Sequence, residues 1–186
     1  QYGAFAGHPK LGAADYKLSC HGLHQRGAYT FCMCPGGTVV AAASEKGGVI
    51  VNGMSTLARD GENANSALLV GIDPVDFPSE HPLAGMYYQR EIEQNAFALG
   101  GGDYRAPAQL VGDFLADRES RALGNVQPTC PTGVTLTNLR YCLPDKVRTT
   151  MQAAITEMDK RLHGFALPDA VLTAPETRSS SSVRIL

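Results

Sequence analysis

The sequence has no tryptophan, little charge and no long apolar run. Charged residues make up 18% and hydrophobic residues 44% of the 186 positions, a globular composition slightly poor in charge. This indicates either a surface partly covered by another domain or a compact domain rich in Gly and Ala. The net charge is −2 without a run of Lys or Arg, which excludes nucleic acid and anionic membranes as partners. The most apolar stretches, 39–43 and 49–51, are too short to span a bilayer.

The N-terminus lacks an initiator Met, and it lacks the basic and apolar regions of a signal peptide. We therefore expect a piece of a longer protein. The five cysteines are an odd number without a secretory signal, which argues against a disulfide framework. The expected compartment is reducing, hence cytoplasmic.

Motifs that hold phosphates or metals are also missing. No G-x-G-x-x-G follows a strand, no G-x-x-x-x-G-K-[ST] occurs, and the glycines at 100–102 follow a helical pattern instead of preceding one. His21 and His24 lie near Cys20, but no third or fourth ligand is evident. The sequence predicts neither a phosphate cradle nor a metal site.

Periodicity divides the chain into two halves. Alternating residues and Gly-rich turns predict strands at 29–33, 38–43, 49–52 and 65–72, joined as an antiparallel meander. Apolar stripes at helical spacing predict helices at 83–99, 107–118 and 144–163, followed by a short strand at 170–173. We expect an α+β fold, an antiparallel β-sheet or meander in the first half packed with about three helices in the second.

Cys32 and Cys34 are one residue apart in a predicted strand and should point to opposite faces. One interpretation is a redox-active or substrate-facing thiol. The other is that one cysteine is a small core residue and its neighbour a turn residue.

Asn52, Ser55 and Arg59 belong to a Gly-containing turn and the polar loop after it. They could present amide, hydroxyl and guanidinium groups to an anionic or carbonyl-bearing ligand. Alternatively, this is a solvated turn whose Asn and Ser cap their own backbone.

Charge and hydroxyl groups concentrate again near the end of the sequence, at 176–184. Glu176 and Arg178 lie two apart and share a face in an extended chain. Arg178 and Arg184 could pair with phosphate or carboxylate groups. The alternative is a disordered Ser-rich tail.

Taken in order, these segments resemble one family, the bacterial predicted FAD-dependent dehydrogenases. The most specific stretch is Tyr-Thr-Phe-Cys-Met-Cys-Pro-Gly-Gly at 29–37. Leu-Gly-Ala-Ala-Asp-Tyr-Lys-Leu at 11–18, Asn-Gly-Met-Ser at 52–55, Asn-Ser-Ala-Leu at 65–68, Pro-Ala-Gln at 107–109 and Glu-Thr-Arg-Ser-Ser at 176–180 also match. The resemblance spans nearly the whole chain.

The resemblance implies that residues 1–186 are a single inserted, substrate-side domain of a flavoprotein. Residues 1–15 and 174–186 would be arms to a split FAD-binding domain, which would hold FAD in the full-length parent. The fragment alone would be inactive and would not bind FAD. The substrate is an unknown small molecule. A non-catalytic ligand- or partner-binding module and an interdomain scaffold stay as alternatives.

Site roles follow from the polar groups that cluster in the matching segments. Glu176 would be a general base or an orienting partner, and Arg178 would hold an anionic group or the charge of the reduced flavin. The full set comprises catalytic Cys32, Cys34, Glu176 and Arg178, cofactor-binding Ser180 and Arg184, and substrate-binding Asn52, Ser55 and Arg59.

Overall fold

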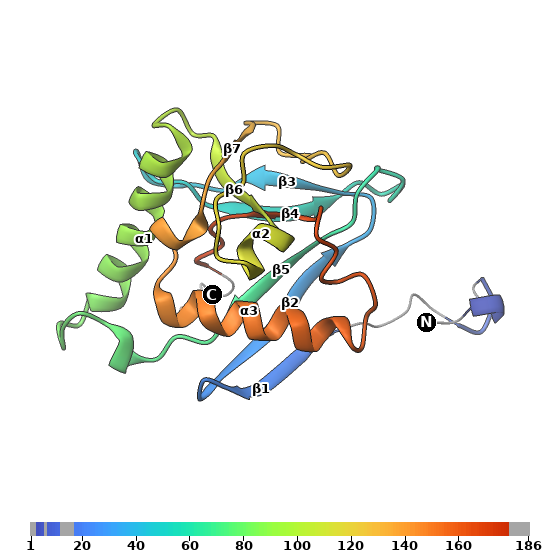
Figure 1. The fold of residues 1–186 in the computed structure, drawn as a ribbon, viewed down its shortest axis with the longest axis horizontal. Helices are drawn as coiled ribbons and strands as arrows, with labels where there is room; N and C mark the ends of the chain where they lie inside the picture. Colours follow the sequence, from blue (N-terminus) through green and yellow to red (C-terminus); the bar gives the residue numbers. More distant parts are fainter. Residues whose placement is uncertain (1–2, 6, 12–16, 179–186) are drawn as a thin grey trace, which may run out of the picture.

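The computed structural model describes residues 3–5, 7–11 and 17–178, which form an α+β fold (Figure 1). The strands are β1 (Ser19–Leu23), β2 (Arg26–Cys34), β3 (Gly37–Ala41), β4 (Val51–Ser55), β5 (Asn65–Val70), β6 (Ala106–Leu110), β7 (Val134–Leu136) and β8 (Val171–Thr173). The helices are α1 (Ala84–Gly100), α2 (Val111–Leu115) and α3 (Asp145–Asp159), with 3-10 turns at Gly3–Phe5, Pro74–Asp76 and Leu139–Tyr141. The predicted fold class is confirmed, with antiparallel strands first and three helices later. Among the described helices, none is long and apolar enough to cross a membrane.

The first sheet has the strand order β1-β2-β5 and is antiparallel throughout. β1 and β2 form a hairpin closed by His24 and Gln25, whose φ angles of 47° and 64° are those of a two-residue type I′ turn. After β2 the chain forms β3 and β4 in another sheet, and it then returns as β5 to pair with the other edge of β2. The long strand β2 is therefore the centre of this sheet.

β3 and β4 form a separate antiparallel hairpin that places Val39 opposite Gly53 and Gly37 opposite Ser55. The predicted turn after β2 is present, and Gly36 adopts a φ of 60° there. The strands on either side of this turn, β2 and β3, do not pair with each other. They belong to different sheets, so the turn carries the chain from the first sheet into the second.

The third sheet corrects the predicted helix at 107–118. Residues Ala106–Leu110 form the strand β6, and only Val111–Leu115 is helical. β6 lies between β7, in parallel register, and β8, in antiparallel register. Ala106 and Ala108 are completely buried, so small side chains let two neighbours approach. Pairing on both edges outweighs the helical preference of alanine.

α3 covers one face of the first sheet, as Figure 1 shows, and contacts β1, β2 and β5. Its apolar stripe buries Met151, Ile155 and Met158, as the spacing predicts. α1 packs against β6 and β7, and it ends where Gly101 adopts a φ of 109°, the left-handed stop expected of this glycine run. The main core lies between these layers.

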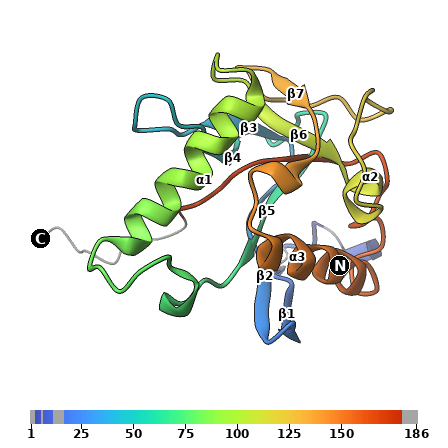
Figure 2. The same cartoon turned by 60° about the vertical axis from the view of Figure 1, so that its left-hand side comes forward.

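The last described residues, 174–178, form what we call the closing segment. It continues from β8 and runs alongside β4 and α1 (Figure 2). The amide of Ala174 donates to the carbonyl of Pro107, and the amide of Val51 donates to the carbonyl of Pro175. The described part of the predicted C-terminal arm thus packs within the fold and joins the third sheet to β4.

Candidate functional site

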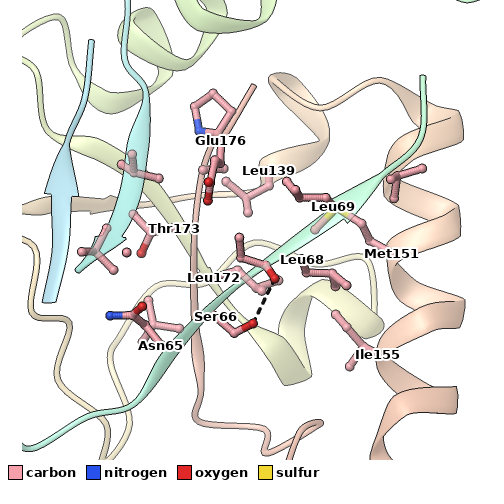
Figure 3. A pocket seen from close by; sticks show the side chains of 18 of the residues that line it. Asn65, Ser66, Leu68, Leu69, Leu139, Met151, Ile155, Leu172, Thr173 and Glu176 are labelled. Carbon is pink, nitrogen blue, oxygen red and sulfur yellow. Dashed lines mark hydrogen bonds between the residues drawn. The ribbon is translucent and has the colours of Figure 1, made fainter. Parts of the chain in front are cut away.

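A pocket of about 1100 Å³ lies between the first sheet, α3 and the closing segment. Figure 3 shows Leu68 of β5, Met151 and Ile155 of α3, and Glu176 and Leu172 around the same space. Most of its wall is aliphatic or aromatic, and its size is at the upper end of small-molecule sites. The arrangement suits a mainly apolar ligand.

Glu176 is the acidic group that the closing segment contributes to this pocket. Its Oε1 atom is inaccessible to solvent and has no hydrogen-bond partner among the described residues. Burial raises the pKa of the Glu176 carboxyl above its ordinary value. A carboxyl group in this state can accept or release a proton closer to neutral pH than an exposed one.

Asn65, at the start of β5, also lines the pocket. Its side-chain amide lies over the β3–β4 hairpin, where a Cβ atom added to Gly37 or Gly53 would come within 2.1 or 2.3 Å of it. Neither Oδ1 nor Nδ2 has a hydrogen-bond partner in the described structure. The two glycines, on neighbouring strands, therefore make the room for this amide, which packs there without a polar partner among the described residues.

Cys32 occupies an irregularity of β2, where the register with β5 shifts between Phe31 and Cys34. Its φ of 45° is uncommon for a residue other than glycine. Such bulges redirect side chains, and here Cys32 is exposed while Cys34 is half-buried. Both thiols are free.

Cys32 and Glu176 are electrostatically coupled although they come from distant parts of the sequence. Although Cys32 as a whole is exposed, the atoms around its sulfur partly desolvate it and raise the pKa of the thiol, and the nearby charges of Glu176 and Cys34 raise it further. The charge of Glu176 thus reaches Cys32, although neither Cys32 nor Cys34 is among the described residues that line the pocket. A raised pKa keeps the Cys32 thiol protonated and lowers its nucleophilicity.

Arg178 points away from this cluster, toward α1. Its Nε and Nη2 atoms donate to the two carboxylate oxygens of Glu93 at 3.2 and 2.9 Å, and its Nη1 donates to Ser44 Oγ at 2.7 Å. The Thr177 hydroxyl donates to Glu93 as well, at 2.6 Å. These contacts fasten the closing segment to α1. The expected role of Arg178 toward an anionic group stays a prediction.

The other predicted residues are spread along β4 and beyond. Asn52 lines the pocket, and its Oδ1 accepts from the amide of Gly53 at 2.7 Å. Ser55 ends β4 opposite Gly37, and Arg59 is exposed with a φ of 54°, both apart from the pocket wall. Ser180 and Arg184 lie outside the described residues.

One polar side chain beside this site, Glu93, was not singled out from the sequence. Glu93 is 2% exposed, and it shares a helical face with the buried residues Ala96 and Gly100. An acidic residue on the same helical face as small residues is a pattern from which its burial could have been predicted. Asn65 belongs to a segment that matches the family, but its packing against glycines of another sheet could not be read from the sequence.

The pocket does not fit the diphosphate of FAD. Its charged lining residues in the described chain are the acids Glu62 and Glu176, without Lys or Arg. α1 and α3 begin after Leu83 and Pro144, without the glycine-rich loop that cradles phosphates. Any FAD contact of the described residues would therefore not be through the diphosphate at this pocket.

Comparison with known proteins places these features in context. A family model described as "FAD-dependent protein, C-terminal domain-like" matches residues 1–179. A protein of Clostridium beijerinckii, described as an uncharacterized protein, is 53% identical over 186 residues. These residues are 100% of this chain and 35% of that protein, so the chain spans about a third of its relative's length.

Proposed function

The chain belongs to the family of FAD-dependent protein, C-terminal domain-like domains, and from this membership we propose that it is the substrate-side domain of an FAD-dependent oxidoreductase. The pocket between α3, the first sheet and the closing segment would be its substrate site. The observation that carries this is the Glu176 carboxyl, whose Oε1 has no partner among the described residues and whose pKa is raised in a ligand-sized apolar pocket.

Glu176 would bind the polar group of the substrate and accept or orient its proton. A general base needs a pKa near the working pH, and burial moves this carboxyl in that direction. The apolar wall would exclude water and hold the carbon skeleton. Cys32 and Cys34 would lie at the edge of the site, where desolvation and the charge of Glu176 both raise the pKa of Cys32.

The cofactor would be held by a FAD-binding domain elsewhere in the longer protein, because the described pocket lacks a phosphate cradle. FAD would supply the redox chemistry, and this domain would supply orientation and electrostatics. The insertion of the domain between two halves of that FAD-binding domain belongs to the same proposal.

The test uses the full-length protein purified with FAD present. We expect a flavin absorption spectrum that changes when naphthalenemethanol, a neutral apolar probe, is added. Val147 lines the pocket from α3, so Val147→Phe should abolish the change while the flavin content stays constant. The matched control is Thr156→Phe, because Thr156 is exposed on the same helix.

Each other outcome has a distinct meaning. A full-length protein without flavin would contradict the oxidoreductase assignment. A probe that binds, as calorimetry would show, without changing the flavin spectrum would favour a ligand-binding module distant from the cofactor. Equal effects of Val147→Phe and Thr156→Phe would remove the pocket from the proposal.

A further inference from the structure

The pocket has an uneven distribution of charge that restricts its ligand. Glu176 and Glu62 are acidic, and no described lysine or arginine belongs to the wall. A ligand carboxylate or phosphate would meet the charge of Glu176 without a compensating cation, and such repulsion is strong where water is excluded. An anionic ligand is therefore disfavoured.

The two acids are not equivalent. Glu62 is exposed, so solvent screens its charge, whereas Glu176 is half-buried and its Oε1 is inaccessible to solvent and has no partner in the described part of the chain. A buried carboxyl without a hydrogen-bond donor is unfavourable. The ligand is thus expected to bring the missing donor to Glu176 and not to Glu62.

We propose that the pocket selects an apolar amine, a carbon ring or chain whose protonated amino group pairs with the Glu176 carboxylate. This rests on the proposed function, because it names the class of substrate for the same pocket. An alcohol could also donate a hydrogen bond. An ammonium group additionally neutralises the carboxylate, and charge-assisted hydrogen bonds are roughly twice as strong as neutral ones.

The lining fits the remainder of such a molecule. Leu68, Leu172 and Ile155 present aliphatic surface around the space that Glu176 enters (Figure 3). An amine with a bicyclic aromatic or comparable aliphatic body would bury its skeleton against these side chains. Burial of apolar surface would supply affinity, and Glu176 would supply selection by charge.

The experiment compares three probes that share one ring system: naphthylmethylamine, naphthalenemethanol and naphthoate. Each is titrated by calorimetry at pH 7 into the full-length protein with its flavin. We expect the amine to bind about tenfold more tightly than the alcohol, and the carboxylate to bind most weakly. Glu176→Gln should remove the preference for the amine and change binding of the alcohol by less than about twofold.

Glu62→Gln is the matched control, since it removes the exposed acid of the same pocket. It should preserve the preference for the amine. Circular dichroism and flavin content of each variant show that the fold is retained. The comparison of the three probes on the unmodified protein tests the amine class even if a variant fails to fold.

The outcomes separate this inference from the proposed function. Equal binding of all three probes, or tighter binding of the alcohol or the carboxylate, would overturn the amine class and leave the pocket as the substrate site. No binding of any probe would overturn both. An amine preference that survives Glu176→Gln would overturn the pairing with Glu176.

Discussion

Glu93 on α1 and Arg178 in the closing segment form an ion pair with two contacts, at 3.2 and 2.9 Å, across 85 positions of sequence. The Glu93 side chain is 2% exposed and that of Arg178 is 42% exposed, so the acid is buried and the base reaches it from the surface. The backbone carbonyl of Glu93 also accepts from the amide of Val49. One residue of α1 thus bonds both the closing segment and the chain that leads into β4.

Arg178→Ala should lower the free energy of unfolding by about 2 kcal/mol, because it leaves the buried Glu93 carboxylate without its cation. Urea unfolding of the chain at pH 7 measures this. The control is Arg121→Ala, since Arg121 is 85% exposed and 3.9 Å from Glu119. A change of less than about 0.5 kcal/mol is expected there. Equal effects of the two variants would show that the Glu93 pair contributes nothing.

Gly53→Ala should destabilise the chain by about 1–3 kcal/mol, the cost of overpacking. The new Cβ would lie 2.3 Å from Asn65 Oδ1. Asn65→Ala removes that atom, so the double variant should be less destabilised than the sum of the single ones. Urea unfolding of the four proteins of this cycle gives the coupling.

Gly71→Ala is the control for this cycle. The nearest atom to its added Cβ would be 4.0 Å away, and a change within about 0.5 kcal/mol is expected. Strict additivity of Gly53→Ala and Asn65→Ala would contradict the close packing between β4 and β5.

Much of the fold could be predicted from the pattern of neighbouring residues in the sequence. The geometry of the site could not be predicted in this way. The stripe of α3 and the left-handed glycine that ends α1 were predictable because both depend on neighbours within one helix. The strand β6 was missed because its partners, β7 and β8, lie far along the sequence. Glu176 was singled out for its neighbours in sequence, yet its raised pKa arises from burial that only the assembled pocket supplies.

The stability of the chain should respond to pH through Glu176. Burial raises the pKa of this carboxyl in the folded chain above its unfolded value. The folded state therefore holds the proton more tightly, and stability is lost as pH rises from the ordinary glutamate pKa through the raised one. Glu176→Gln removes this loss.

The difference in unfolding free energy between Glu176→Gln and the unmodified chain should thus favour the variant at pH 7, and the advantage should shrink toward pH 4. Urea unfolding at both pH values measures the difference, in which the other titrating groups cancel. A difference that does not vary with pH would contradict a raised pKa at Glu176.

Cys32 provides a chemical probe of the same carboxylate. The charge of Glu176 helps to raise the pKa of the Cys32 thiol, so Glu176→Gln should shift the pH profile of its alkylation toward lower pH. Desolvation of the sulfur is the larger cause of the raised pKa. The midpoint of the alkylation profile should therefore stay at a higher pH than that of a free thiol. The rate of iodoacetamide modification, followed by peptide mass analysis, measures the profile. Cys142 is an internal reference, since burial raises its pKa to about 12 and it should stay unmodified. An unchanged Cys32 profile in Glu176→Gln would show that the two side chains are not coupled, and Cys32 would then be only an exposed thiol on a strand bulge.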